Sequence, residues 1–515
     1  MIDVFNCIKA SSEVGDQDKT NKKIAYLHKY WSRKPFNLIE DCILRYSKKG
    51  NVVVDPFCGS GSTGLGAILN DREYIGYDLN PSAIFITDCT LDTKFDSSAF
   101  EEEFKQIVSD LKSRIMELYR VGESRFILYA FSGKAPEQYN AVTADYDFKD
   151  KNKELLSSEN ISPAIEIPSD LSYPDKEFPK RFYKDRFSYK GVKNVSDMFT
   201  RRNLLALAVI YNYLNNSDFK YKKLFQLALS NTILHVSKLK AENVRPLSVN
   251  NYWIPDDNIE ENVIWRFIDR VKRVKSAKEV IRQKQNNRKS KANNYKLINK
   301  SSIFLDDISD NTIDYIITDP PYGDVIQYSE LSYIWNCWFG QDFFTEDEVI
   351  INPAQDKDQS DFQGQISIFL ENTYRVLKPN AFFTLCFQNK DVDIWLKIIL
   401  KIKSIGFTLE DIRIYDTLGS PYNKHWAKFS PKADLYVTFR KKEKRTASKG
   451  EITPDAIIDT VIDHIGKEDF DLNKGYDLFV ASVINYIFNG YDIISLDKWN
   501  LKKIISIYEQ RIGTE

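Results

Sequence analysis

Residues 51–64 read NVVVDPFCGSGSTG, and this stretch decides the fold. Its first part, NVVVD, is a short β-branched run typical of a buried strand, and the glycines that follow predict a turn into a helix. YIGYD at residues 74–78 predicts a second strand, after which Asn80 and Pro81 predict the start of another helix. Strands that alternate with helices in this way predict a parallel sheet in an α/β protein.

Further along the chain, this alternation stops near residue 95 and resumes after residue 295. In between, apolar periodicity predicts helices at 202–214 and 223–239, and a polar, proline-bearing stretch at 145–185 predicts loop. Beyond the gap we expect strands at 301–308, 313–322 and 381–387, helices around 369–377 and 394–405, and a closing strand pair that ends near Arg440.

The pattern predicts one discontinuous α/β core with two additions. We expect the core at residues 24–95 and 296–440, a mostly helical insertion at 96–295, and a small acidic helical region at 450–515. The alternative is two independent domains. It is disfavoured because the first piece alone has too few strands to bury both faces of a parallel sheet.

The charge of the chain is uneven, although its total is close to zero. The 515 residues carry 72 Lys and Arg against 73 Asp and Glu, a net charge of -1. Residues 265–300 nevertheless hold 13 bases and two acids, residues 440–449 six bases and one acid, and residues 450–515 six bases and 12 acids. The near-zero total therefore does not exclude a nucleic-acid partner.

Composition excludes several other classes of protein. Hydrophobic residues make up 43% of the chain, which excludes wholesale disorder. No apolar run reaches the length of a membrane span and the N-terminus has no signal-like stretch, so we expect an intracellular, cytoplasmic protein. The six cysteines form no CxxC pair and there are only four histidines, so neither a metal site nor a disulfide framework is expected.

DPFCGSGSTG, at residues 55–64, predicts a site for a nucleoside-bearing cofactor. It joins a strand to a helix, and its glycines let a ligand approach the N–H groups at the helix start. Asp78 follows Asp55 by 23 residues, a spacing suited to binding ribose hydroxyls. The spacing is not G-x-G-x-x-G and no GK[ST] occurs, so neither a dinucleotide nor a nucleoside triphosphate motif is present. A glycine-bearing turn without a ligand is the alternative.

TDPPYGD, at residues 318–324, predicts a catalytic site. Two prolines after a strand make a rigid corner and remove two N–H donors, so the backbone carbonyls can face a ligand. Asp319 and the Pro320 carbonyl can accept the two hydrogens of an exocyclic amine, and Tyr322 can stack on the ring of a planar base. The lone pair of the amine is then aimed at an electrophile. The alternative is a β-turn with a core tyrosine.

Together, the two motifs resemble those of the amino-group (N4/N6) DNA methyltransferase family, specifically its adenine-specific DNA methylase type with a DPPY motif. DPFCGSGSTG resembles the family's S-adenosylmethionine loop, and DPPYG resembles its catalytic tetrapeptide with a following glycine. Weaker similarities are HKYWSRKPFNLIEDCIL (28–44) to its K-P helix, YIGYDLNPSA (74–83) to its ribose-binding segment, and RVLKPNAFFTL (375–385) to the strand after the catalytic loop. The resemblance implies a Rossmann-like class I S-adenosylmethionine-dependent methyltransferase sheet in the family's alpha-type motif order.

The resemblance also implies roles for individual residues. It places in the cofactor site Lys34, Pro35, Asp55, Pro56, Phe57, Gly59, Gly61, Asp78 and Asp306, with Asp307 an equal candidate for the place of Asp306. It places in the catalytic site Asp319, Pro320, Pro321 and Tyr322. Because family members with an aspartate at this position more often act on adenine, adenine is favoured over cytosine as the target.

A base within a duplex cannot reach such a site, so the target nucleotide must be extruded while the protein holds the DNA. The residues expected to bind DNA are Lys272, Arg273, Lys275, Arg282 and Lys284 in the basic stretch, and Tyr252 and Trp253 in VRPLSVNNYWIP (244–255). The alternatives are a solvated helix face for the bases and a packing role for the aromatic pair. Tyr328, in YSELSYIW (328–335), is a weaker candidate that closes over the flipped base.

The sequence thus predicts an S-adenosylmethionine-dependent DNA methyltransferase that acts on adenine N6, in restriction-modification or phage defence. The alternatives are cytosine N4 transfer, transfer-RNA guanine N2 transfer and, as the weakest, a non-catalytic DNA-binding subunit of a defence complex. Double-stranded DNA is the expected partner. The acidic C-terminal region can dock a restriction or defence subunit, or it can simply cap the fold as a helical bundle.

Overall fold

The computed structural model describes most of the chain, and the statements that follow concern the described residues. These are residues 2–4, 8–10, 19–31, 33–121, 125–131, 138–143, 154–157, 166–180, 182–241, 252–288, 294–342, 345–389, 391–416, 433–442, 447–466, 472–494 and 499–512. The predictions for residues 244–251, and for part of the stretch 145–185, lie outside the described residues.

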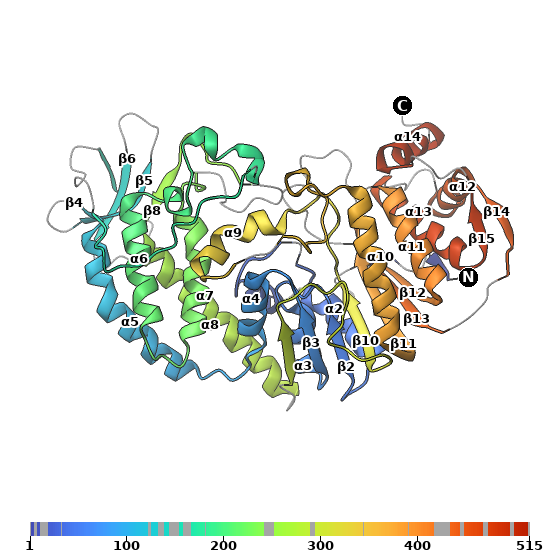
Figure 1. The fold of residues 1–515 in the computed structure, drawn as a ribbon, viewed down its shortest axis with the longest axis horizontal. Helices are drawn as coiled ribbons and strands as arrows, with labels where there is room; N and C mark the ends of the chain where they lie inside the picture. The colour runs from blue at the N-terminus through green and yellow to red at the C-terminus, as the bar shows by residue number, and fades with distance from the viewer. Residues whose placement is uncertain are drawn as a thin grey trace.

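An eight-stranded sheet contains strands from both predicted pieces of the core (Figure 1). Its order is β1 (Ile8–Ala10), β12 (Phe407–Asp416), β13 (Ala433–Lys441), β11 (Leu377–Phe387), β10 (Ile313–Thr318), β2 (Val52–Asp55), β3 (Glu73–Tyr77) and β9 (Tyr295–Ile298). β10 is parallel to both neighbours, with Tyr315 opposite Val53 of β2 and Phe382 of β11. β13 runs antiparallel to β11 and β12. Strands of both predicted pieces thus lie in one sheet.

Both faces of this sheet are covered, which explains why its central strands are apolar throughout. Consecutive residues Val53 and Val54 are both fully buried but enter different hydrophobic cores, because strand side chains alternate between faces. The core that contains Val54 also takes residues of α10 (Gln359–Val376) and α11 (Val392–Ile405), and the core that contains Val53 takes residues of α2 (Phe36–Tyr46) and α3 (Ser62–Leu69).

The insertion forms a helical lobe to the left of the sheet in Figure 1. Its long helices are α5 (Ser97–Glu117), α6 (Arg201–Asn215), α7 (Lys222–Ile233) and α8 (Val263–Arg288). It also holds an antiparallel sheet that the sequence analysis did not predict, made of β4 (Arg120–Val121), β5 (Arg125–Phe131), β6 (Gln138–Thr143), β7 (Glu154–Ser157) and β8 (Ile259–Glu261). α9 (Tyr328–Trp338) buries Leu331 and Trp335 in the core of this lobe.

One predicted strand is misplaced. The sequence predicts a strand at residues 301–308, but the strand is β9, which ends at Ile298, and residues 301–308 form a loop. The apolar residues that produced the prediction are still buried: Ile303, Leu305 and Ile308 pack in the core beneath α10. Leu305 has a φ of 46°, which no strand residue adopts.

The C-terminal region packs on the opposite end of the sheet, on the right in Figure 1. It comprises β14 (Gly450–Ile452), α12 (Pro454–Ile465), α13 (Leu472–Phe488), β15 (Tyr491–Ile493) and α14 (Leu501–Ile512). Residues of all three helices share one core with α11 and the sheet, so this region buries part of the fold. In the described ranges, no helix has both the length and the apolar character needed to cross a bilayer.

Candidate active site

Three acidic residues meet where neighbouring parallel strands end. Asp55 is the last residue of β2, Asp78 follows β3, and Asp319 follows β10. Because β10, β2 and β3 are adjacent and parallel, their carboxyl ends lie at one edge of the sheet, where α/β proteins bind ligands. All three acids line one pocket with about 930 Å³ of empty space, including its open mouth. That space suits a nucleoside-sized ligand.

The predicted glycine turn forms part of the wall of this pocket. The Gly59 N–H donates to Asp78 Oδ2 at 2.9 Å and so connects the turn after β2 to the end of β3. Gly61 has a φ of 83° and lies immediately before α3 (Ser62–Leu69), where a side chain would be strained. A Cβ atom on Gly61 would also lie only 3.0 Å from Thr87 Cγ2. The turn therefore requires glycine for its backbone and for its close packing.

Burial makes the first two carboxyl groups weaker acids than usual. Asp55 accepts a hydrogen bond from the Thr318 hydroxyl at 2.8 Å, but desolvation raises its pKa to about 6. Desolvation likewise raises the pKa of Asp78 to about 7, although two backbone N–H groups donate to it. Perturbed acids gathered in one pocket are typical of a functional site.

Asp319 lies in a network with Tyr322, Lys34 and Asp434. The Tyr322 hydroxyl donates to Asp319 Oδ1, and Lys34 Nζ lies 3.6 Å from Asp319 Oδ2. Lys34 also donates to the Tyr322 hydroxyl at 2.7 Å and to Asp434 Oδ1 at 3.1 Å. Desolvation raises the pKa of Asp319 to about 7, while the Lys34 charge and the Tyr322 hydrogen bond act in the opposite direction. Asp319 is 20% exposed, so a ligand in the pocket can reach it.

Several residues that sequence reasoning missed complete the pocket. Tyr30 stacks on Tyr328 with ring centroids 6.0 Å apart, and Asn80 donates to the Tyr30 hydroxyl at 3.3 Å. Arg33 donates to Ser60 Oγ at 2.7 Å, beside the glycine turn. Burial lowers the pKa of Arg33 to about 10, so it stays positively charged at neutral pH. Other lining residues without a predicted role are Trp31, Ser301, Ser302, Thr318, Asp347, Glu348 and Val349.

The remaining predicted site residues lie beside the pocket or away from it. Pro35, Pro56, Gly61, Pro320 and Tyr322 adjoin lining residues in sequence but are not themselves part of the lining. Asp306 and Asp307 are exposed, do not line the pocket, and pair with Lys300 at 2.7 and 3.3 Å. Near them, the chain reaches the pocket through Ser301 and Ser302.

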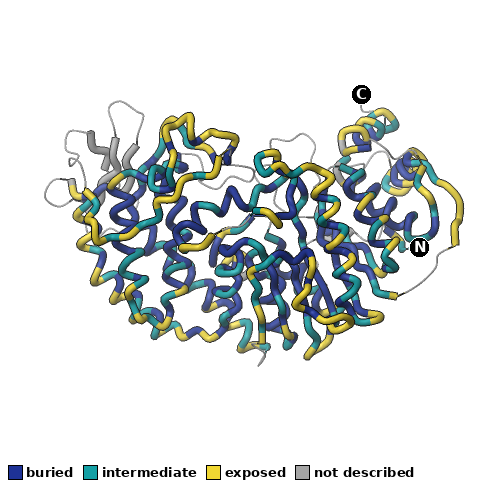
Figure 2. The backbone as a smooth tube through the Cα atoms, in the orientation of Figure 1, coloured by how far each residue is buried: buried dark blue, intermediate teal, exposed yellow. Residues whose placement is uncertain are grey.

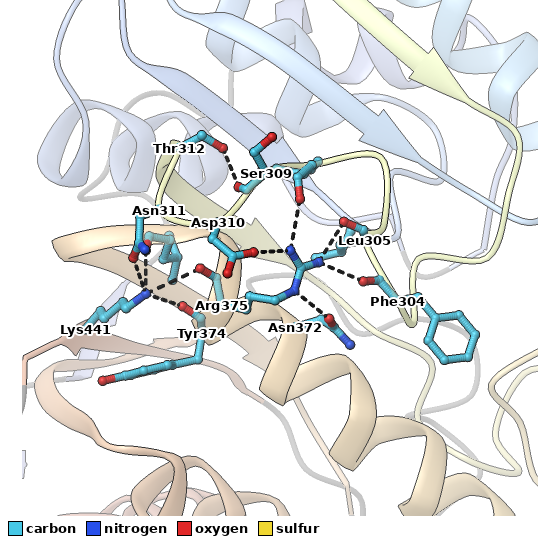
Figure 3. Close-up of polar contacts among 12 residues, drawn as sticks. Phe304, Leu305, Ser309, Asp310, Asn311, Thr312, Asn372, Tyr374, Arg375 and Lys441 are labelled. Carbon is cyan, nitrogen blue, oxygen red and sulfur yellow. Dashed lines mark hydrogen bonds and ion pairs between the residues drawn. The ribbon is translucent and has the colours of Figure 1, made fainter.

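Arg375 of α10 holds the loop that follows these two serines (Figure 3). Its guanidinium donates to the carbonyls of Phe304, Leu305 and Ile308, at 3.0 to 3.1 Å, and binds Asp310 at 2.7 Å. The remaining N–H donates to Asn372 Oδ1 at 2.9 Å. One arginine thus ties the backbone between β9 and β10 to the helix behind it.

The predicted DNA-binding residues differ in their surroundings. Lys272 and Arg282 are exposed, whereas Arg273 pairs with Asp269 at 3.0 Å and Lys275 with Glu101 at 2.7 Å. Lys284 lies over the Phe36 ring, 5.6 Å from its centroid. Tyr252 is buried, and Trp253 is 52% exposed. Among the residues that the structure describes, no cluster of three His, Cys, Asp or Glu side chains could hold a metal ion.

Comparison with known proteins identifies the family to which the chain belongs. The N6/N4 methylase family profile, described as DNA methylase, matches residues 5–89 and 313–505, more than half of the chain. Orphan methyltransferase M.BamHII of Bacillus amyloliquefaciens is 46% identical over 66 residues, which are 13% of this chain and 24% of that protein. Type II methyltransferase M.HpaI of Haemophilus parainfluenzae is 30% identical over 133 residues, 25% of this chain and 42% of that protein.

The chain therefore spans less than half the length of either relative. A solved structure, the rRNA methyltransferase AviRa of Streptomyces viridochromogenes, aligns with a TM-score of 0.31 and 8% identity, over 84% of this chain and 97% of its own. That similarity is too distant to inform the site.

The sheet, with helices on both faces and a pocket at its carboxyl edge, is that of a Rossmann-like S-adenosylmethionine-dependent methyltransferase. Within that class, the chain belongs to the N6/N4 DNA methylase family. S-adenosylmethionine is the cofactor that the family implies, and the pocket fits it in two respects. Asp78 offers a partly buried carboxylate for hydroxyl groups, and the glycine turn offers a close approach to the main chain.

Proposed function

We propose that this protein transfers a methyl group from S-adenosylmethionine to the exocyclic amine of a base flipped out of duplex DNA, and that the base is adenine. One observation carries the proposal: Asp319 of the DPPY motif lines the same pocket as the glycine turn and Asp78. A cofactor bound along β2 and β3 would therefore lie beside a carboxylate suited to an amine.

We assign each part of the cofactor to different residues of the pocket. S-adenosylmethionine, when bound, supplies an electrophilic methyl group. In our assignment Asp78 accepts hydrogen bonds from the ribose hydroxyls, and Asp55, Phe57, Gly59 and Gly61 surround the methionine part. Lys34 is engaged by Asp319 and Asp434, whereas the neighbouring Arg33 reaches the glycine turn. We therefore assign the methionine carboxylate to Arg33.

The catalytic step uses the acceptors around Asp319. The Asp319 carboxylate and the Pro320 carbonyl accept the two hydrogens of the target amine, and Tyr322 stacks on the base. The Tyr322 hydroxyl donates to Asp319 Oδ1, and the carboxylate has further lone pairs that can accept from the amine. The amine nitrogen then gains the methyl group and loses one proton, which Asp319 is placed to accept. A carboxyl group with a pKa near 7 suits that proton transfer at neutral pH.

The target base and the biological role are part of the proposal. Asp319, at the first position of DPPY, supports adenine N6 as the acceptor. The type II names of the relatives support a role in restriction-modification or phage defence. We propose that the insertion, residues 96–295, selects the target sequence, with Lys272, Arg282 and Trp253 as exposed DNA contacts. The acidic C-terminal region remains our candidate for docking a partner subunit.

A parallel transfer assay tests the proposed function. Methyl-labelled S-adenosylmethionine is offered with duplex DNA, transfer RNA and protein, using the wild type and Asp319→Ala. We expect label in DNA for the wild type, none for the variant, and cofactor binding by both in calorimetry. Label found in transfer RNA alone would overturn the proposal. Loss of cofactor binding by a folded Asp319→Ala protein would overturn the division of roles within the pocket.

A further inference from the structure

Residues 182–185 of the insertion form a turn that contains three residues in the left-handed backbone region. Tyr183, Lys184 and Asp185 have φ angles of 55°, 54° and 59°. A side chain with a Cβ atom disfavours this region, and three such residues in succession make an unusual turn. Backbone of this kind persists only where the surroundings fix it, and it is concentrated at functional sites.

The turn is fixed to the helix that follows the catalytic motif. Tyr183 is fully buried, its N–H donates to Glu330 Oε2 at 3.0 Å, and its hydroxyl donates to the Glu330 carbonyl. Its ring packs against Phe187 and Tyr252, with centroids 4.3 and 5.7 Å away. Glu330 belongs to the first turn of α9, two residues beyond Tyr328, which lines the pocket. The turn is therefore fixed to the helix that carries the pocket residue Tyr328.

The anchored segment presents positive charge and an aromatic ring to solvent. Residues 182–193, FYKDRFSYKGVK, hold four bases and one acid. Lys184 and Lys190 are exposed, and the Tyr189 side chain is 85% exposed. Lys190 pairs with Asp256, but both groups are well exposed, and such surface pairs are weak enough to exchange for a phosphate. Figure 2 shows exposed residues along the loops in this part of the insertion.

The basic helix α8 offers less free charge than its sequence indicates. Lys278 is buried and donates to the carbonyls of Cys89 and Asp92. Arg288 pairs with Glu40, which also binds Asn70 at the end of α3 away from the glycine turn. Several bases of α8 thus hold the fold together, whereas Lys184, Lys190 and Lys193 in the segment 182–193 are exposed.

We infer that residues 182–193 bind the backbone of duplex DNA beside the flipped base, with Lys184 and Lys190 on phosphates and Tyr189 packed against the exposed face of a nucleotide. The inference rests on the proposed function and adds a DNA contact outside the basic helix. Because Tyr183 ties the segment to Glu330, DNA held there is aligned with α9 and the catalytic loop. Phosphate contacts supply salt-dependent affinity, and an aromatic contact supplies affinity that salt changes little.

Binding of a fluorescein-labelled duplex of mixed sequence, followed by anisotropy over a range of KCl concentrations with S-adenosylhomocysteine present, tests this inference. Lys184→Gln and Lys190→Gln should each weaken binding several-fold and reduce the slope of log affinity against log salt by about one. Tyr189→Ala should weaken binding at an unchanged slope. Lys502→Gln, on an exposed position of α14 at the other end of the molecule, is the matched control and should change neither quantity.

A glycine variant separates DNA binding from folding. Lys184→Gly removes the side chain and relieves the left-handed strain, so it should raise the thermal midpoint of unfolding and still weaken DNA binding. Unchanged affinity and slope in all of these variants would overturn the inference. If the wild type methylates DNA in that case, the proposed function stands. A wild type that neither binds nor methylates duplex DNA would overturn both.

Discussion

Lys34 and Asp319 form an ion pair, with Nζ 3.6 Å from Oδ2, although 284 residues separate them in the chain. The lysine is 9% exposed and donates to Asp434 as well. Burial alone would lower the pKa of Lys34, but its two carboxylate neighbours raise it, so it keeps its charge. That charge lowers the pKa of Asp319, but desolvation raises the same pKa by more. The resulting pKa is about 7. The carboxyl group that we propose as catalytic thus has a pKa near neutral pH.

The first prediction concerns the pH dependence of methyl transfer. An amine needs the ionised form of Asp319 as its acceptor, and that form is lost as pH falls below about 7. The single-turnover rate should therefore rise with pH through about 7 and level off above it, with a fall of about tenfold per unit well below it. Rapid-quench measurement at saturating cofactor and DNA checks this. A flat profile across neutral pH would show that Asp319 does not titrate in the step.

The second prediction concerns Asp434, which acts through Lys34. Its negative charge contributes to the raised pKa of Asp319 and draws the lysine away from that carboxylate. In Asp434→Asn, Lys34 should pair more closely with Asp319, so the pH midpoint should shift downward and the plateau rate should fall about tenfold. Lys378→Gln removes a lysine–aspartate pair outside the pocket and is the control. An unshifted midpoint in Asp434→Asn would contradict the coupling.

The third prediction separates two adjacent cations. Arg33→Gln should raise the Kd for S-adenosylmethionine, by about tenfold or more, because it removes the charge assigned to the methionine carboxylate. Lys34→Gln should change that Kd little and instead lower the rate of transfer at saturating cofactor. Calorimetry and single-turnover kinetics on both variants make the comparison. The reverse pattern would contradict the assignment to Arg33 and would indicate that Lys34 binds the methionine carboxylate.

The fourth prediction concerns Arg375, which binds three carbonyls of the loop after Ser301 and Ser302 (Figure 3). A lysine cannot replace this planar fork. Arg375→Lys should lower the free energy of unfolding by about 1–3 kcal/mol and weaken cofactor binding, because both serines line the pocket. Arg45→Lys, at an exposed pair, should cost less than about 0.5 kcal/mol. Urea unfolding and calorimetry check both variants. Equal effects would contradict the positioning role.

Local sequence predicted the fold wherever a strand, turn and helix follow each other directly. The glycine turn and the DPPY corner are of this kind, and both lie at strand ends as expected. The prediction of a strand at 301–308 was wrong. Buried residues such as Ile303, Leu305 and Ile308 give the same apolar sequence pattern in a loop as in a strand. That loop depends on Arg375, 67 residues beyond Ile308, which no local pattern reveals.

The acids of the pocket were predictable for the same reason, since Asp55, Asp78 and Asp319 belong to motifs. Asp434 and Glu348 do not belong to a recognisable motif. They come near the site only when the chain is folded. Surface charge was hardest to predict. The count along α8 could not show that Lys278 is buried, or that the bases of a shorter segment at 182–193 are exposed. A count of charged residues describes composition, whereas DNA binding depends on which of those side chains are exposed.

Nucleoside analysis of methylated DNA tests the central claim most directly. Duplex DNA is incubated with the wild-type protein and methyl-labelled S-adenosylmethionine, digested to nucleosides and separated by chromatography with mass detection. Our account predicts label in N6-methyladenine and none when Asp319→Ala replaces the wild type. Label in N4-methylcytosine would contradict the choice of base, and DNA without label, from an enzyme that binds its cofactor, would contradict the account as a whole.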